Sequence, residues 1–107
     1  MERTREERAE ISKTIIEQMG GNMFARMTGA KHFVSLESGL RFTIPGRGFT
    51  KRGINLVTIT LDPSDTYTVK FDKTWKTRII PVSEHAGVYN DMLQKIFTAE
   101  TGLDTHF

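Results

Sequence analysis

The sequence predicts an α+β fold in which an N-terminal helix, an antiparallel meander of about four to five strands and a C-terminal helix follow one another. Apolar residues recur at helical spacing near both ends of the chain, whereas they alternate with polar residues between positions 40 and 71. The links between the alternating stretches are short, which favours antiparallel pairing of neighbours. We expect one or both helices to cover one face of the sheet.

The first predicted helix begins at a capping box, Thr4-Arg5-Glu6-Glu7. In this motif the threonine hydroxyl and the glutamate side chain each satisfy an otherwise unpaired backbone N–H group. The helix ends at Gly20-Gly21, and residues 1–10 are expected to fray because they lack an apolar anchor. Its apolar stripe consists of Ile11, Ile15, Ile16 and Met19.

Residues 22–38 carry a weaker pattern. We interpret Met23–Met27 as a strand, Thr28-Gly29-Ala30 as a break and Lys31–Leu36 as a second strand.

Clear period-2 alternation then marks three strands. The first runs through Leu40, Phe42 and Ile44 and ends at Pro45-Gly46, the second contains Val57, Ile59 and Leu61, and the third contains Tyr67, Val69 and Phe71. Asp62-Pro63-Ser64-Asp65, between the second and third, has the aspartate and proline of a type I turn.

The last elements follow from shorter signals. Asp72-Lys73-Thr74 predicts a turn into a final strand through Arg78–Ile80 that ends near Pro81. Thr101-Gly102-Leu103 is typical of a Schellman helix ending, in which glycine takes the left-handed conformation and Leu103 folds back on Phe97. The helix before it has a broad apolar stripe made of Val88, Tyr89, Met92, Leu93, Ile96 and Phe97.

Length and composition predict one soluble domain spanning residues 1–107. The absence of cysteine excludes disulfides, thiolate metal sites and cysteine nucleophiles. No apolar run reaches the ~20 residues of a membrane span, and the charged N-terminus lacks the apolar stretch of a signal peptide. We therefore expect a cytosolic protein that does not contact a membrane.

The positive charge is concentrated in the middle of the chain. Residues 41–78 contain eight basic and three acidic side chains, although the whole chain has a net charge of only +2. Such asymmetry indicates a polyanionic partner.

The segment PGRGFTKRG, residues 45–53, lies in this basic region. It is not a P-loop, because Ile54-Asn55 stand where a lysine and a hydroxyl residue are required and a strand follows. It is not a dinucleotide-binding fingerprint either, because Lys51 occupies the position of the third glycine.

Two interpretations of this segment stay open. In the first, Arg47, Lys51 and Arg52 contact phosphates while Phe49 stacks on a base. Trp75 is then a second exposed aromatic residue, and the basic strip is extended by Lys70, Lys73, Lys76 and Arg78. In the second, the segment is a solvated connection, and Phe49 and Trp75 pack on the core.

The sequence offers little support for a metal site or a catalytic site. His32, His85 and His106 have no histidine or acidic partner at metal-ligand spacing, and Asp62 and Asp65 fit a role in the turn. We predict no catalytic residue, no metal and no cofactor. The methionines and Phe24 suit either a pliable binding surface or ordinary packing; the methionines concerned are Met19, Met23, Met27 and Met92.

Four segments are distinctive when they are taken together: IIEQMGGNMFARMTGA, GLRFTIP, INLVTITLDPSDTYTVKF and HAGVYNDMLQKIFTAETGL. In this combination the chain resembles a family of small phage and prophage proteins that carries no assigned activity. The resemblance covers residues 11 to 103, and the GGN…MTGA and DTY blocks are its most distinctive parts. The resemblance implies expression in the cytoplasm of a bacterial host.

The sequence thus leads to two hypotheses of function. The first is a non-enzymatic phage accessory module that binds nucleic acid through the basic strip. The alternative is a protein-binding adaptor or inhibitor of a bacterial host factor, recognised through an edge strand or a methionine-rich patch.

Overall fold

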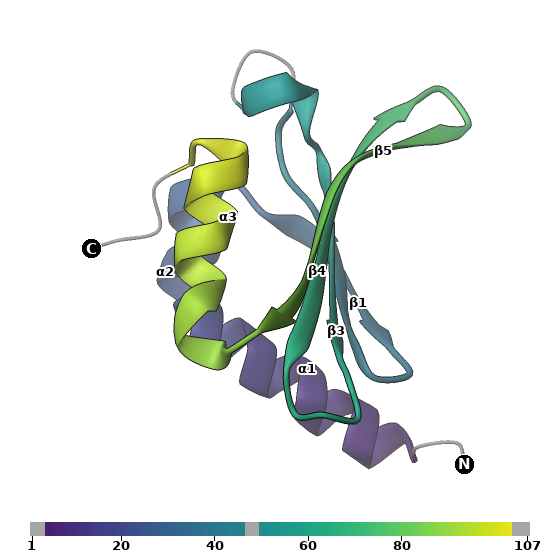
Figure 1. Ribbon diagram of the computed structural model, residues 1–107, viewed down its shortest axis with the longest axis vertical. Coiled ribbons are helices and arrows are strands. Elements are labelled where there is room, and N and C mark those ends of the chain that lie inside the picture. Colours follow the sequence, from purple (N-terminus) through teal and green to yellow (C-terminus); the bar gives the residue numbers. More distant parts are fainter. Residues whose placement is uncertain (1–3, 47–49, 104–107) are drawn as a thin grey trace.

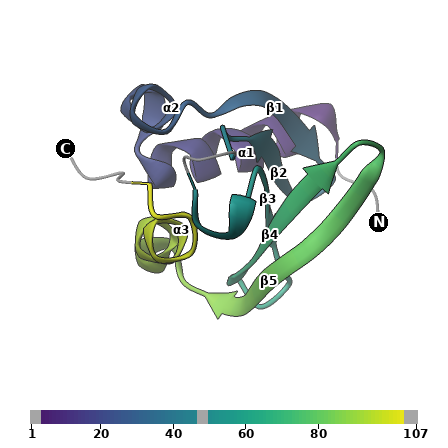
Figure 2. The same cartoon turned by 90° about the horizontal axis from the view of Figure 1, so that it is seen from above.

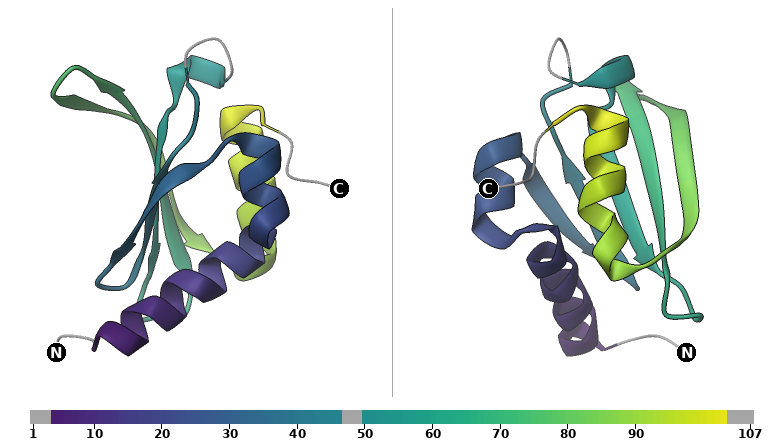
Figure 3. Two further views of the ribbon diagram at one scale, coloured as in Figure 1. Left: turned by 180° about the vertical axis from the view of Figure 1, so that it is seen from behind. Right: turned by 60° about the vertical axis from the view of Figure 1, so that its left-hand side comes forward.

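A computed structural model of the protein describes residues 4–46 and 50–103 and confirms the α+β fold (Figure 1). Five antiparallel strands form one sheet in the order β1-β2-β3-β4-β5, so each strand pairs with its neighbour in sequence. The helices gather on one face of this sheet, and the other face is left open (Figure 3). The elements are α1 (Arg5–Met19), α2 (Gly21–Thr28), β1 (Lys31–Leu36), β2 (Gly39–Thr43), η1 (Lys51–Gly53), β3 (Leu56–Leu61), β4 (Tyr67–Trp75), β5 (Arg78–Val88), η2 (Asn90–Met92) and α3 (Leu93–Thr101).

Helix α1 begins and ends where the sequence predicts. Thr4 caps it, since the Glu7 N–H group donates to the Thr4 hydroxyl oxygen at 3.1 Å and the Glu7 side chain returns to the Thr4 N–H group. Ile15 and Met19 are buried against the sheet. The Ser12 hydroxyl lies 2.7 Å from the Ser35 Oγ atom and 3.1 Å from the Gly39 carbonyl oxygen. Helix α1 is therefore fixed to both β1 and β2.

The predicted strand over Met23–Met27 is wrong, because these residues belong to α2. Residues 23–27 also satisfy helical spacing, since Phe24 and Thr28 are four residues apart and both are buried. Gly29 ends the helix in the left-handed conformation that glycine adopts without steric cost. Thr28 belongs to the helix, so the predicted break is confined to Gly29 and Ala30, and the strand over Lys31–Leu36 is confirmed.

The last two strands are longer than the sequence predicts. Asp72-Lys73-Thr74 is not a turn, because β4 continues to Trp75 and the chain reverses at Lys76-Thr77. The Asn55 side chain supports this extension: its Oδ1 atom accepts a hydrogen bond from the Thr74 N–H group at 2.8 Å.

The predicted strand end near Pro81 is also wrong, since β5 runs on to Val88. Val88 therefore belongs to the sheet, and Tyr89 precedes the short helix η2, so neither lies on the C-terminal helix as predicted. Helix α3 ends at Gly102, whose left-handed backbone lets its N–H group donate to the Thr98 carbonyl oxygen at 2.8 Å.

Three phenylalanine rings join the helices to the sheet at the centre of the core. The Phe24 ring of α2 meets the Phe42 ring of β2 edge-on at 5.4 Å and the Phe97 ring of α3 at 5.2 Å. Aromatic pairs in this geometry add about 0.5–1.5 kcal/mol each to the free energy gained from burial. The cluster explains why α2 and α3 pack side by side on one face of the sheet (Figure 2).

Strands β1 and β5 are the two edges of the sheet. The pairing of β1 with β2 shifts register between Lys31 and Val34, where His32 has a left-handed backbone with φ of 59°. The pairing of β5 with β4 shifts register twice, and Pro81 lies within the strand opposite Asp72. Both edges are therefore irregular.

Within the parts of the chain that the structure describes, no helix has both the length and the apolar surface that a membrane span requires.

Candidate nucleic-acid interface

The paired ends of β4 and β5 form a two-stranded arm that projects beyond the helices (Figure 1). We call residues 73–80 the hairpin arm. Lys73 stands opposite Ile80, and Trp75 stands opposite Arg78. The turn at its tip includes Lys76, whose backbone is left-handed with φ of 58°. No acidic residue occurs between Asp72 and Glu84, so the arm carries only positive charge.

The two faces of the hairpin arm differ in composition. Residues directly opposite each other in an antiparallel pair share a face, and successive residues alternate between faces. One face of the arm therefore carries two cations, an aromatic ring and an aliphatic side chain, namely Lys73, Arg78, Trp75 and Ile80. The other face carries Thr74 and Ile79.

The aromatic and aliphatic side chains of the arm are open to solvent. Trp75 is 49% exposed and Ile79 is 55% exposed, and neither belongs to the hydrophobic core. The interpretation in which Trp75 packs on the core is therefore wrong. Phe49 and Arg47, which belong to the same two interpretations, lie outside the described residues.

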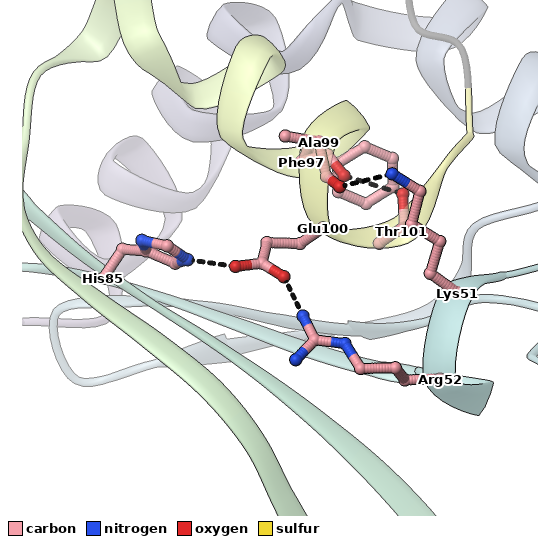
Figure 4. A network of polar contacts seen from close by, with 7 residues as sticks. All are labelled: Lys51, Arg52, His85, Phe97, Ala99, Glu100 and Thr101. Atoms are coloured by element: carbon pink, nitrogen blue, oxygen red, sulfur yellow. Dashed lines mark hydrogen bonds and ion pairs between the residues drawn. The ribbon is translucent and has the colours of Figure 1, made fainter.

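The described part of the segment 45–53 closes against the end of α3. The Thr50 hydroxyl lies 3.0 Å from the Gly46 carbonyl oxygen and 2.7 Å from the Ile54 carbonyl oxygen, so it draws the two ends of the segment together. The Lys51 Nζ atom donates to the Ala99 carbonyl oxygen at 3.1 Å (Figure 4). A cation at this position is favoured by the negative end of the helix dipole.

Glu100 of α3 connects this segment to β5 (Figure 4). Its carboxylate is 15% exposed and accepts a hydrogen bond from the Arg52 guanidinium. The other carboxylate oxygen lies 2.5 Å from the His85 Nε2 atom. Burial acts to raise the pKa of Glu100, but the His85 hydrogen bond and the positive charges of Arg52 and His85 outweigh it, so the pKa lies below its ordinary value.

These contacts give Lys51 and Arg52 a structural role that their position in the sequence does not indicate. Arg52 is 53% exposed, yet a carboxylate largely offsets its charge. No pattern in the sequence indicates the His85–Glu100 contact, because the two residues lie on different elements, 15 positions apart. The sequence analysis does not predict any role for Glu100.

Lys70 lies on the opposite face of the sheet from the helices. It belongs to a row across the open face in which Arg41, Thr58, Lys70 and Glu84 stand opposite one another in turn. The Lys70 Nζ atom is 4.0 Å from the Glu84 carboxylate. The residues next to Lys70 in β4 have their side chains on the helix side of the sheet. Lys70 therefore lies on the other side of the sheet from them.

Asp72 is a second feature of the open face that the sequence did not reveal. Its side chain is buried, with only 6% of the residue exposed. Burial raises the pKa of Asp72, and the positive charges of Lys70 and Arg41 oppose this effect only in part. The negatively charged form of the Asp72 side chain is thus disfavoured in the folded protein.

The structure therefore divides the predicted basic strip into three parts. Lys51 and Arg52 contact α3, Lys70 lies on the open face, and the remaining cations occupy the hairpin arm, namely Lys73, Lys76 and Arg78. The arm adjoins the segment 45–53 at its base, because a Cβ atom built on Gly53 would lie 3.4 Å from the Lys73 Cδ atom. The arm thus combines cations with an exposed aromatic ring.

The methionines divide in a similar way. Met19 is buried in the core, whereas Met23 and Met27, one turn apart on α2, are exposed, as is Met92. Met19 therefore has a packing role. Met23 and Met27 form an exposed pair on the surface of α2.

No protein-family model, curated protein or solved structure matches this chain. The resemblance to small phage and prophage proteins therefore stays a prediction.

Proposed function

We propose that this protein is a non-enzymatic module that binds nucleic acid through its hairpin arm. The observation that carries the proposal is the composition of the arm: three cations and an exposed tryptophan on a projecting ribbon without any acidic side chain. Lysine and arginine neutralise phosphates, and aromatic rings stack on bases. The geometry of a two-stranded ribbon also fits the grooves of nucleic acids.

The resemblance supports a setting for this activity. We place the module among the accessory proteins of a phage or prophage, acting in the cytoplasm of a bacterial host. Nucleic acid is abundant there, and a small basic arm needs no cofactor to engage it.

The test is a titration of labelled oligonucleotides, followed by fluorescence anisotropy at several salt concentrations. If the three arm cations contact phosphates, the logarithm of the binding constant should fall with the logarithm of salt concentration with a slope of about −2 for a single strand. Absence of binding at low salt, or a slope near zero, would contradict the proposal.

A pair of charge-reversal variants assigns the binding to the arm. Lys76→Glu combined with Arg78→Glu should weaken binding by at least about tenfold at low salt. Arg26→Glu combined with Lys95→Glu changes the net charge equally but on α2 and α3, where both side chains are exposed. If the control variant loses as much affinity as the arm variant, the arm is not the interface.

The methionine pair favours a second candidate function, binding to a host or phage protein. Thioether side chains adapt to varied partners, and Met23 and Met27 are exposed although they are apolar. A protein retained from nuclease-treated bacterial lysate at stoichiometric amounts should be lost with Met23→Ser and Met27→Ser together. Loss of the same protein with the arm variant instead would contradict a role for α2.

A further inference from the structure

Asp72 places a buried carboxylate on the open face of the sheet (Figure 3). Only 6% of the residue is exposed, and among residues 4–46 and 50–103 no hydrogen bond or ion pair reaches its side chain. Buried polar groups are normally satisfied by hydrogen bonds, and a buried charge is normally paired. A residue that weakens the fold without an internal partner is expected at a functional site. Asp72 therefore indicates a ligand that supplies the missing partner.

Two cations lie near Asp72 on the same face. Lys70 precedes it by two residues in β4, about 7 Å away along the strand. Arg41 of β2 stands in the same row as Lys70, and its Nε atom donates to the Thr58 hydroxyl oxygen at 3.3 Å. The positive charges of Lys70 and Arg41 both act on the Asp72 carboxylate. This part of the open face thus presents a hydrogen-bond acceptor beside two groups that attract anions.

These groups define the ligand by its complementary chemistry. An ionised carboxylate has two acceptor oxygens, so it favours a partner with two adjacent N–H donors. Lys70 and Arg41 repel a purely cationic partner, such as a lysine side chain, and attract a phosphate. Guanine has two adjacent donors on its Watson–Crick edge, N1–H and the N2 amino group, and its nucleotide carries the phosphate. Adenine, cytosine and thymine each have one donor position on this edge, next to an acceptor that a carboxylate repels.

We infer that Asp72 recognises the Watson–Crick edge of an unpaired guanine, while Lys70 and Arg41 contact the phosphates beside it. This inference rests on the proposed function, the binding of nucleic acid, and adds a base preference to it. Asp72 immediately precedes the hairpin arm, so one single strand reaches both. In a duplex, base pairing already occupies the Watson–Crick edge, so the ligand is single-stranded.

Oligonucleotides that differ in one base test the inference. Fluorescence anisotropy at low salt compares strands of about 12 thymidines that carry guanine, adenine or hypoxanthine at the centre. Hypoxanthine keeps the N1–H group of guanine but lacks the N2 amino group. The guanine strand should bind at least about tenfold more tightly than the adenine strand, with the hypoxanthine strand between them, because each lost hydrogen bond to a charged group costs about this factor or more.

Substitutions assign the preference to Asp72. Asp72→Asn keeps the size of the side chain but replaces one acceptor oxygen by a donor. It should weaken binding of the guanine strand by roughly 10- to 150-fold, the loss expected for a hydrogen bond to a charged group, and remove the preference over adenine. Glu84→Gln is the matched control, because it removes the same charge from an exposed position on the same face. It should keep the preference for guanine.

Loss of folding does not explain a loss of binding by Asp72→Asn. Removal of a buried charge without a partner relieves a cost of folding, so this variant should be at least as stable as wild type. Circular dichroism checks that both variants are folded.

The outcomes distinguish this inference from the proposed function. A guanine preference that disappears in Asp72→Asn and persists in Glu84→Gln supports the inference. Equal binding of the three strands by wild type, or a preference that Asp72→Asn retains, overturns it and leaves the proposed function standing. If Asp72→Asn removes the preference while Lys76→Glu combined with Arg78→Glu changes nothing, the inference stands and the arm is not the interface. Absence of any anisotropy change overturns the proposed function, and the inference falls with it.

Discussion

Replacement of Glu100 by glutamine should destabilise the protein at neutral pH by about 1 to 3 kcal/mol. The carboxylate pairs with the Arg52 guanidinium and lies at hydrogen-bond distance from the His85 ring, in a site that is largely shielded from water. A hydrogen bond to a charged group contributes about 1.5–3 kcal/mol. The Arg52 contact counts for less, because that side chain is half exposed and surface ion pairs contribute about 0.2–1 kcal/mol. The glutamine oxygen can still accept one bond, which limits the loss.

The effect should depend on pH in a defined direction. The pKa of Glu100 in the folded protein lies below its ordinary value of 4.5. A carboxyl group with a lowered pKa stabilises the folded state above the ordinary value, and this contribution is lost as pH falls through the folded pKa. The difference in unfolding free energy between wild type and Glu100→Gln should therefore be largest near neutral pH and should close under acid conditions below pH 4.5.

Urea unfolding at neutral and acid pH measures this difference. The control is Glu84→Gln, because Glu84 is 58% exposed and its contact with Lys70 is 4.0 Å long. That change should cost less than about 1 kcal/mol. If Glu100→Gln costs no more than the control at neutral pH, or if its effect grows as pH falls, the reasoning about the shielded carboxylate is refuted.

Four further substitutions test other parts of the fold by the same urea unfolding. Asp72→Asn should stabilise the protein near neutral pH and lose this advantage in acid, because burial raises the pKa of Asp72 and a raised pKa disfavours the charged form; destabilisation at neutral pH would contradict this. Gly39→Ala should cost about 3 kcal/mol or more, since its Cβ atom would lie 2.1 Å from the Ile59 carbonyl oxygen. Gly87→Ala has space around it but a left-handed backbone, so about 1–2 kcal/mol is expected, and an equal loss at both glycines would count against the close approach of β2 and β3. Phe97→Ala should cost about 3–5 kcal/mol, and a loss below 2 kcal/mol would show that the ring cluster is not central.

Local signals in the sequence predict much of the fold. The capping box at Thr4 and the glycine after α3 work through bonds within a few residues, so they do not depend on the rest of the protein. The alternation in β2 and β4 is equally local, because exposed Arg41 and Lys70 each stand between buried apolar neighbours. In β3 the polar residue Thr58 is buried as well, so there the alternation marks the strand but not an exposed face.

The errors arise where distant residues decide the conformation. Residues 23–27 fit both a strand and a helix, and contacts of Phe24 with Phe42 and Phe97 favour the helix. Thr74 stays in β4 because Asn55, 19 positions earlier, holds its backbone. Turn propensity at residues 72–74 was therefore overridden by tertiary structure.

The candidate site shows the same division. The sequence shows that the middle of the chain is basic, but it cannot show which cations meet a carboxylate in the folded protein. Arg52 does so through Glu100 of α3, 48 positions away, whereas the arm cations occupy a segment that lacks acidic residues in the sequence itself. The positive charge of the arm can therefore be predicted from the sequence, whereas the contacts of Glu100 cannot.

Pro81 has a consequence for the exposed edge of the sheet, because β5 is an edge strand. In the edge strand β5, two exposed apolar residues, Ile79 and Ile80, immediately precede this proline. An exposed apolar edge strand normally recruits further strands and leads to aggregation. Proline has no N–H group to offer an incoming strand, and the neighbouring register shift bends the edge away. Pro81 therefore disfavours the addition of a further strand at this edge of the sheet.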